Sequence, residues 1–281
     1  MSTTTEARPN LERVRAEQLE ALRRDGITAS RGAFPRAWVE RLREDIDAAF
    51  ADARGREGGA VGRGPCRYYV EIHPEQLRGF VDLVTHPWVT SVAEAVLGPD
   101  YEIVEVGFDI PLAGAVNQPW HRDFPAPRET LEDHRYTSLA FNLTAVDTEE
   151  DMGPFEIALG TQFDAPDERW LHEMFPPREQ YRRFEERAVR KYPSMGDVSV
   201  RSALTVHRGT VNRSAKARPV LVLGMDGPDA SGAVDHSPTV TQRYWRTLPE
   251  QVRRHLRCPV VDELTPIVQK HQIEGLVMGE A

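Results

Sequence analysis

The spacing of apolar residues changes near residue 100, and this change limits the folds open to the chain. Before it, apolar residues recur at helical spacing over residues 11–24, 38–50 and 87–97. After it, Val104, Val106, Phe108 and Ile110 alternate with polar or small residues. A period near 3.6 is typical of an amphipathic helix, and a period of two is typical of a strand. The sequence therefore predicts a helical N-terminal part, about residues 10–100, followed by a β core.

The core is expected to contain several short strands. Alternating or apolar runs occur at residues 138–144, 197–200, 204–207 and 219–225, with turn residues between them. Such a series favours an antiparallel sandwich or barrel. We expect one domain over residues 1–281. Its parts are the helical N-terminal part, a core of about 101–230 with a charged helical insertion at about 166–193, and a C-terminal extension of about 240–281.

Composition narrows the range of partners and of cell compartments. The net charge is −9 at pH 7, which argues against a nucleic-acid binder because such proteins need a basic face. No apolar run is long enough to span a bilayer, and the first residues lack the apolar stretch of a signal peptide. The two cysteines form no CxxC pair, so we expect a reducing cytoplasm. No segment marks an oligomer interface.

The stretch QPWHRDF at residues 118–124 contains a candidate pair of metal ligands. His121 and Asp123 lie two positions apart, as in the 2-His-1-carboxylate sites that hold non-haem iron(II) and leave coordination positions open. The HxD pattern is weak evidence alone, because HPE at residues 73–75 is a second match of the same kind. A metal site would need a further histidine from elsewhere in the chain.

His207 and Arg218 supply that missing context. His207 follows the strand-like SALTV, and Arg218 lies eleven residues later beside another apolar run. If two adjacent strands place both side chains inside a barrel, the arginine needs an anion, because a buried unpaired charge is costly. Arg213 is a rival for the same role. The alternative is a core histidine and an arginine in a surface turn.

Four motifs in this order resemble the phytanoyl-CoA dioxygenase family of iron(II)- and 2-oxoglutarate-dependent oxygenases. They are HPWVTSVAEAVLGP, QPWHRD, DMGPFEIALGTQF and GDVSV…ALTVHRGTVNRSAKAR, and together they span most of the chain. The third usually ends in Gly-Ser-His, and here it ends in Gly160-Thr161-Gln162. The resemblance implies a mainly β fold with flanking helices, the double-stranded β-helix or cupin-like jelly roll. It implies His121, Asp123 and His207 as catalytic iron ligands.

The resemblance also implies a co-substrate site. Arg218 would bind the C5 carboxylate of 2-oxoglutarate, with Phe141 and Arg67 as further residues near the co-substrate. With iron(II), 2-oxoglutarate and O2, such an enzyme oxidises an unactivated C–H bond of a small molecule by hydroxylation or ring closure. We expect a polar natural product as substrate, tailored in bacterial secondary metabolism such as antibiotic biosynthesis. The alternatives are a redox-silent metal-dependent isomerase or epimerase, and a non-catalytic binding module.

Overall fold

A large antiparallel sheet forms the centre of the computed structural model, which describes residues 13–125, 128–164, 170, 173–230 and 236–269. Its seven strands lie in the order β1-β8-β5-β10-β4-β3-β2. Their bounds are β1 Ile27–Ser30, β2 Val61–Gly62, β3 Arg67–Glu71, β4 Glu102–Pro111, β5 Ser138–Thr144, β8 Val198–Ser202 and β10 Val220–Asp226. The long crossovers between neighbours are typical of a jelly roll.

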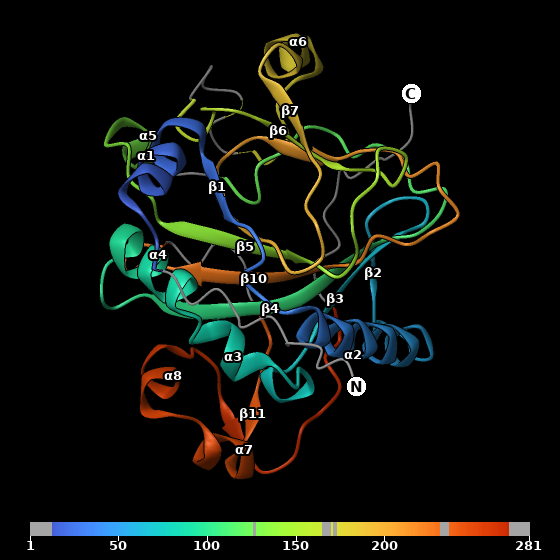
Figure 1. The fold of residues 1–281 in the computed structure, drawn as a ribbon, viewed down its shortest axis with the longest axis vertical. Coiled ribbons are helices and arrows are strands. Elements are labelled where there is room, and N and C mark those ends of the chain that lie inside the picture. Colours follow the sequence, from blue (N-terminus) through green and yellow to red (C-terminus); the bar gives the residue numbers. More distant parts are fainter. Residues whose placement is uncertain (1–12, 126–127, 165–169, 171–172, 231–235, 270–281) are drawn as a thin grey trace, which may run out of the picture.

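A second, smaller sheet faces the first. It consists of β7 (Ala188–Lys191), β6 (Phe155–Ala158) and β9 (His207–Gly209), in that order. Figure 1 shows this sheet above the large one, with the helices α2 to α4 on the opposite side of the large sheet. Two facing antiparallel sheets with flanking helices confirm the predicted double-stranded β-helix.

The helices cover the apolar face of the large sheet. α2 (Arg36–Arg54), α3 (Phe80–Val84) and α4 (Pro87–Leu97) lie against it, and α1 (Ala16–Asp25) packs beside β1. Short helical turns occupy η1 (Pro74–Gln76), α5 (Arg128–Glu132), η2 (Arg178–Gln180) and α6 (Tyr181–Glu185). Among the described residues, no helix has both the length and the apolar character needed to cross a bilayer.

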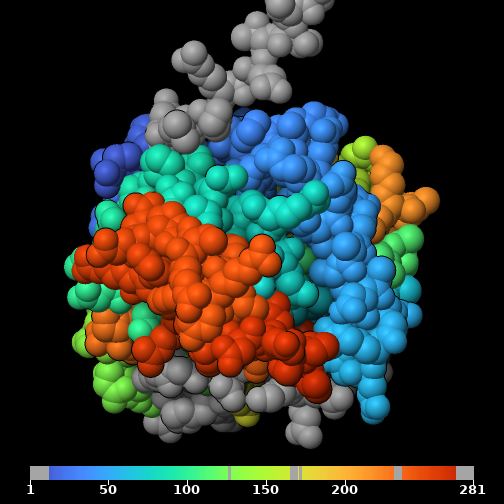
Figure 2. Space-filling model, turned by 90° about the horizontal axis from the view of Figure 1, so that it is seen from below, coloured from blue at the N-terminus to red at the C-terminus, as the bar shows by residue number. Residues whose placement is uncertain are grey.

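The C-terminal extension is attached to the turn after β3. It contains the parallel pair β11 (Val240–Thr241) and β12 (Val260–Val261), with α7 (Gln242–Thr247) and α8 (Glu250–His255). The backbone of Thr239 donates to His73 Nδ1 at 2.9 Å, and that of Thr241 donates to Glu75 Oε2 at 2.7 Å. Figure 2, seen from below, shows this orange and red segment beside the helices of the N-terminal part. Residues 270–281 of the predicted extension lie outside the described residues.

Three boundaries differ from the sequence prediction. The N-terminal part also supplies strands, because β1 pairs with β8 and β3 pairs with β4. The predicted helical insertion at 166–193 is helical only at 178–185 within its described part, since residues 188–191 pair with β6 as strand β7. The predicted strand at 204–207 begins only at His207, after a turn. In the first two cases pairing with a distant strand outweighs the local pattern.

Candidate metal centre

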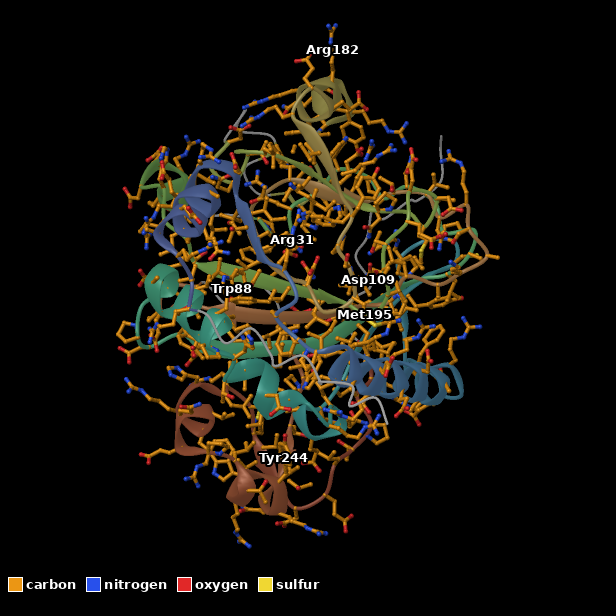
Figure 3. All side chains as sticks on the ribbon, in the orientation of Figure 1. Arg31, Trp88, Asp109, Arg182, Met195 and Tyr244 are labelled. Atoms are coloured by element: carbon orange, nitrogen blue, oxygen red, sulfur yellow. The ribbon has the colours of Figure 1, made fainter. Side chains whose placement is uncertain are left out.

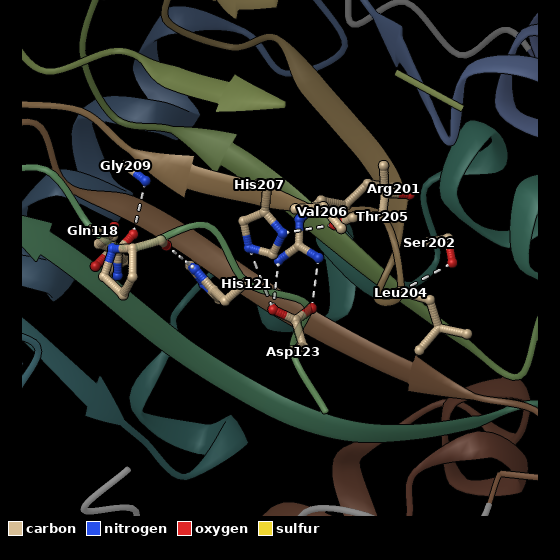
Figure 4. A network of polar contacts seen from close by, with 12 residues as sticks. Gln118, His121, Asp123, Arg201, Ser202, Leu204, Thr205, Val206, His207 and Gly209 are labelled. Carbon is tan, nitrogen blue, oxygen red and sulfur yellow. Dashed lines mark hydrogen bonds and ion pairs between the residues drawn. The ribbon is translucent and has the colours of Figure 1, made fainter. Parts of the chain in front are cut away.

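His121, Asp123 and His207 converge between the two sheets. One ligand atom from each lies within 4.8 Å of the others. His207 is the first residue of β9, whereas His121 and Asp123 lie in the irregular segment that follows β4. That segment is fixed by its backbone: His121 forms an isolated bridge with His207, and the Asp123 amide donates to Ala203 O at 2.9 Å. Figure 4 shows the resulting arrangement.

Both histidines have one ring nitrogen turned toward the centre. His121 Nδ1 lies 2.8 Å from Pro119 O, and His207 Nδ1 lies 2.9 Å from Thr205 O. A carbonyl oxygen can only accept, so each Nδ1 carries the proton and each Nε2 keeps a lone pair. Burial lowers the pKa of His121 to about 4 and that of His207 well below its usual value. Neutral imidazoles oriented in this way suit a divalent metal.

Arg201 adds a fourth side chain to the centre. From β8, its guanidinium donates to both carboxylate oxygens of Asp123, at 2.5 Å to Oδ2 and 3.1 Å to Oδ1. Burial alone would raise the pKa of Asp123, but the charge of Arg201 and the nearby His207 hold it below its usual value. The carboxylate therefore stays ionised, as a metal ligand must be. No motif in the sequence marked Arg201; the only signal was a charged residue within an otherwise apolar and small-residue strand.

A cavity of about 810 Å³ lies beside these residues. Its floor is the polar side of the alternating strands: in β5, Ser138, Ala140, Asn142 and Thr144 line it. Asp109 of β4 also lines it, on the side of the large sheet that faces the small one (Figure 3). The polar half of the strand alternation thus faces an internal chamber, and the apolar half faces the helices.

Two buried arginines occupy one part of this chamber. Arg218, 4% exposed, donates from Nε to Gly153 O at 2.9 Å, and Arg67, 1% exposed, forms an ion pair with Asp109 at 2.9 Å. Burial, and then the charge of Arg67, lowers the pKa of Arg218 to about 10. Two cations facing one carboxylate leave an excess positive charge, which an anionic ligand would neutralise. The rival Arg213 is exposed on a loop.

Gly209 makes this arrangement of arginines possible. A Cβ atom at Gly209 would lie 2.4 Å from Nη2 of Arg67. The guanidinium therefore occupies space that any other residue at this position would fill. The glycine lies two residues after His207 on β9, so one short strand supplies both a candidate metal ligand and the room for an arginine.

Phe141 is not part of the chamber, which corrects the expectation that it lines the co-substrate site. It is fully buried on the opposite face of β5, where its ring meets that of Trp88 at a centroid distance of 6.2 Å. Successive strand residues point to opposite faces, so its neighbours Ala140 and Asn142 face the cavity instead. The expected position was therefore wrong by one residue along β5, which places the side chain on the opposite face of the sheet.

A second polar group lines the chamber beyond β4, and no sequence motif predicted it. The Tyr69 hydroxyl donates to Glu105, and His236 lies 3.3 Å from Glu71. Burial would lower the pKa of His236, but Glu105 and Glu71 raise it to about 9. Tyr69, Glu105 and His236 all line the cavity. These residues come from β3, β4 and the C-terminal segment, so only folding brings them together.

An aromatic cluster supports the segment that carries the ligands. Trp120 and Trp170 are fully buried in it, and guanidinium groups cover their rings, Arg208 over Trp120 at 4.3 Å and Arg122 over Trp170 at 4.0 Å. Arg122, which lies between the two ligands in sequence, thus points away from them into this cluster. Cation–π contacts of this kind strengthen when they are shielded from water. The cluster fixes the backbone from which His121 and Asp123 project.

A jelly roll with a buried His-Asp-His group and adjacent arginines is the architecture of the non-haem iron, 2-oxoglutarate-dependent enzymes. Residues 22–220 match the family of phytanoyl-CoA dioxygenase (PhyH). The match covers well over half of the 281 residues, and the chain belongs to this family. It is therefore a 2-oxoglutarate-dependent non-haem iron dioxygenase by class, as the sequence motifs predicted.

Solved structures of similar fold agree with this placement. The chain resembles SnoK, a non-heme alpha ketoglutarate dependent carbocyclase from nogalamycin biosynthesis, with a TM-score of 0.62 and 16% identity over 83% of this chain and 96% of that one. EctD from S. alaskensis, solved with 2-oxoglutarate and 5-hydroxyectoine, gives 0.62 and 17% over 79% of each chain. HygX from Streptomyces hygroscopicus, with nickel and 2-oxoglutarate bound, gives 0.59 and 13% over 81% and 91%. At these identities the likeness concerns the fold.

Proposed function

We propose that His121, Asp123 and His207 hold one iron(II) ion and that the chain uses it to oxidise a C–H bond of a small polar molecule. The observation that carries this proposal is the convergence of two Nε2 lone pairs and one carboxylate within 4.8 Å. Three protein ligands on one side of a metal leave three positions for exogenous ligands. That number suits a chelating keto acid together with O2.

Arg218 and Arg67 would hold 2-oxoglutarate. The co-substrate carries a second carboxylate at the end remote from its keto group, and the excess positive charge in the chamber is suited to it. The Nε of Arg218 is committed to Gly153 O, which leaves its two Nη groups for a bidentate contact. Arg67 is fixed by Asp109, so it contributes charge more than a direct bond.

The bound iron, with 2-oxoglutarate and O2, supplies the oxidising power for C–H cleavage. The protein residues position and isolate the reactants. The two histidines stay neutral because burial lowers their pKa values, and the carbonyl groups that accept from Nδ1 keep each Nε2 free of a proton. Asp123 stays ionised beside Arg201. The buried walls limit water at the centre, which protects a reactive species from side reactions.

A polar substrate fits the remaining walls of the chamber. Tyr69, Glu105, Asn142, Asp226 and His236 line it with hydrogen-bonding groups of both polarities. A hydroxylated or amine-bearing metabolite could satisfy these groups, whereas a long acyl chain could not. We infer tailoring of a polar natural product, by hydroxylation or ring closure, as in antibiotic biosynthesis.

An anaerobic spectroscopic titration tests the function. Iron(II) and then 2-oxoglutarate are added to the metal-free protein, and the visible charge-transfer band of the chelate is recorded. We expect a band that needs both components and that is absent from the His207→Ala variant. Iron-loaded protein that shows no band with 2-oxoglutarate would overturn the oxygenase proposal in favour of a redox-silent isomerase. Folded protein that takes up no metal at all would favour a binding module.

A further inference from the structure

Among the acids of the described residues, Arg201 pairs with Asp123 alone. Its side chain is 7% exposed, and the ion pair with Asp123 is the only one that the described residues offer it. Both Nη groups donate to this carboxylate, whereas Nε is buried without a hydrogen-bond partner. A buried donor without a partner is unusual and calls for an explanation. Here the position of Arg201 on β8 directs both Nη groups to Asp123 and leaves Nε without an acceptor.

The register of the large sheet fixes that geometry. Arg201 on β8 lies directly opposite Ala140 on β5, and Ala140 lies opposite Gly224 on β10. Paired residues of neighbouring strands point to the same face, so Arg201 lies between Ile27 of β1 and the small side chain of Ala140, with Gly224 one strand further along the chamber floor. Above it, its guanidinium carbon lies 5.8 Å from the centre of the Phe155 ring. The side chain thus has room on the side of Ala140, and its guanidinium reaches Asp123.

The two oxygens of Asp123 are not equivalent. Oδ2 receives the shorter bond from Arg201, 2.5 Å, whereas Oδ1 receives the longer one, 3.1 Å, and lies 3.4 Å from Nε2 of His207. Oδ1 is therefore the oxygen turned toward the other candidate ligands. A metal at the centre would compete with the weaker of the two contacts and leave the stronger one in place.

We propose that Arg201 is a positioning residue that restricts Asp123 to one metal–oxygen contact. It retains Oδ2 and leaves Oδ1 for the metal, so the carboxylate cannot chelate through both oxygens. This keeps a third coordination position open, which the keto acid and O2 together require. The inference rests on the proposed iron site and adds to it the residue that sets how the carboxylate binds.

The test counts the open positions directly, with manganese(II) alone as the probe. Water-proton relaxation reports the number of water molecules on the bound ion, which is three for one-oxygen binding and two for chelation in a six-coordinate site. We expect Arg201→Met to bind manganese(II) with about one third less relaxation enhancement than the unaltered chain. Arg201→Gln, which lacks the charge, should show the same loss of relaxation enhancement. It replaces Arg201→Met in the experiment if the methionine variant does not fold. Arg201→Lys should restore the enhancement.

A second readout follows 2-oxoglutarate on the iron(II) protein. We expect its affinity to fall by about 10-fold in Arg201→Met and to recover in Arg201→Lys. The control is Arg190→Met. Arg190 lies on the outer strand β7 and forms an ion pair with Glu156 of β6, so its replacement removes an arginine ion pair and should change neither readout. Circular dichroism verifies the fold of each variant.

The outcomes separate this inference from the proposed function. Unaltered protein that binds neither manganese(II) nor iron(II) would refute the iron site itself. Unaltered protein that binds both, with an Arg201→Met variant of equal relaxation enhancement and equal 2-oxoglutarate affinity, would refute only the role of Arg201. A folded Arg201→Met variant that no longer binds manganese(II) would also refute it, because the arginine would then be needed to assemble the site.

Discussion

His121 and His207 exchange both of their backbone hydrogen bonds. The amide of His121 donates to His207 O at 3.0 Å, and the amide of His207 donates to His121 O at 2.9 Å. This single antiparallel pair holds the two rings at a centroid distance of 4.3 Å. The spacing of the two candidate ligands is therefore set by the main chain, so it exists before any metal binds.

Replacing His121 by alanine should remove the metal without unfolding the protein. The backbone pair with His207 survives the change, whereas one of three ligands is lost. We expect iron(II) affinity to fall by at least about 100-fold, beyond the usual effect of an outer-shell change. Metal content after dialysis measures it. His255→Ala, which alters a histidine stacked on Tyr101 outside the cavity, is the control and should retain the metal. Equal iron content in both variants would contradict the assignment.

Replacing Arg218 by methionine should weaken 2-oxoglutarate binding and leave iron binding intact. Truncating a buried partner of a carboxylate costs about 2 kcal/mol or more, equivalent to at least about 30-fold in affinity. Titration of the charge-transfer band gives the dissociation constant. Arg213→Met, an exposed arginine five residues away, is the matched control and should have no effect. A larger effect at Arg213 than at Arg218 would reverse the choice between them.

The stability of the metal-free protein should pass through a maximum as pH varies. Burial depresses the pKa values of His121 and His207, so the unfolded chain binds their protons more readily. The free energy of unfolding should fall as pH drops below about 6.5, by about 1.4 kcal/mol per unit for each histidine. His236, with its pKa raised to about 9, has the opposite sign, so its contribution is lost as pH rises from about 6.5 through 9.

Urea denaturation from pH 5 to 9 measures both limbs of this pH profile. His236→Gln should flatten the alkaline limb alone, and His121→Ala should reduce the slope of the acid limb. A His236→Gln variant that keeps the full alkaline decline would show that another group controls it.

Replacing Gly26 by alanine should disturb the metal centre from a distance. Gly26 has φ of +78°, and a Cβ atom there would lie 2.4 Å from Oγ1 of Thr205, whose carbonyl holds the His207 ring. We expect a loss of about 2–5 kcal/mol in the free energy of unfolding, with weaker metal binding. Gly32→Ala is the control, since φ is +59° there with open space around it. It should cost only about 1–2 kcal/mol and leave metal binding unchanged.

The sequence predicted the parts of the site that lie in linear motifs. His121 and Asp123 share one short motif, and His207 and Arg218 lie in one block eleven residues apart. The two strands expected next to each other there lie in different sheets, since His207 begins β9 of the small sheet and Arg218 precedes β10 of the large one, and both side chains still line the cavity between the sheets. Arg67, which the family resemblance put near the co-substrate, lines the same cavity, on a strand that was not predicted; its role there stays a prediction. The signal was its position as the basic residue before the aromatic pair in CRYYVEI.

The remaining features depend on pairing between distant strands. Arg201 reaches Asp123 because the amide of Asp123 donates to Ala203 O, directly after β8, and Tyr69 meets Glu105 because β3 lies beside β4. No local pattern encodes either neighbour relation. The misplacement of Phe141 has a different origin: alternation alone gives two faces but does not say which of them meets the helices. In this protein the polar face of β5 lines the cavity, and the apolar face packs against the helices.

The hydrogen bond from the Ser237 amide to Glu71 Oε1, at 3.0 Å, attaches the chain beside His236 to the edge of the chamber. His236 and Ser237 lie beyond residue 220, where the family match stops. The candidate metal ligands thus lie within the segment that matches the family, residues 22–220, whereas His236, which lines the cavity, lies outside it. Mutations near His236 could therefore change which substrate the cavity accepts without altering the candidate metal ligands.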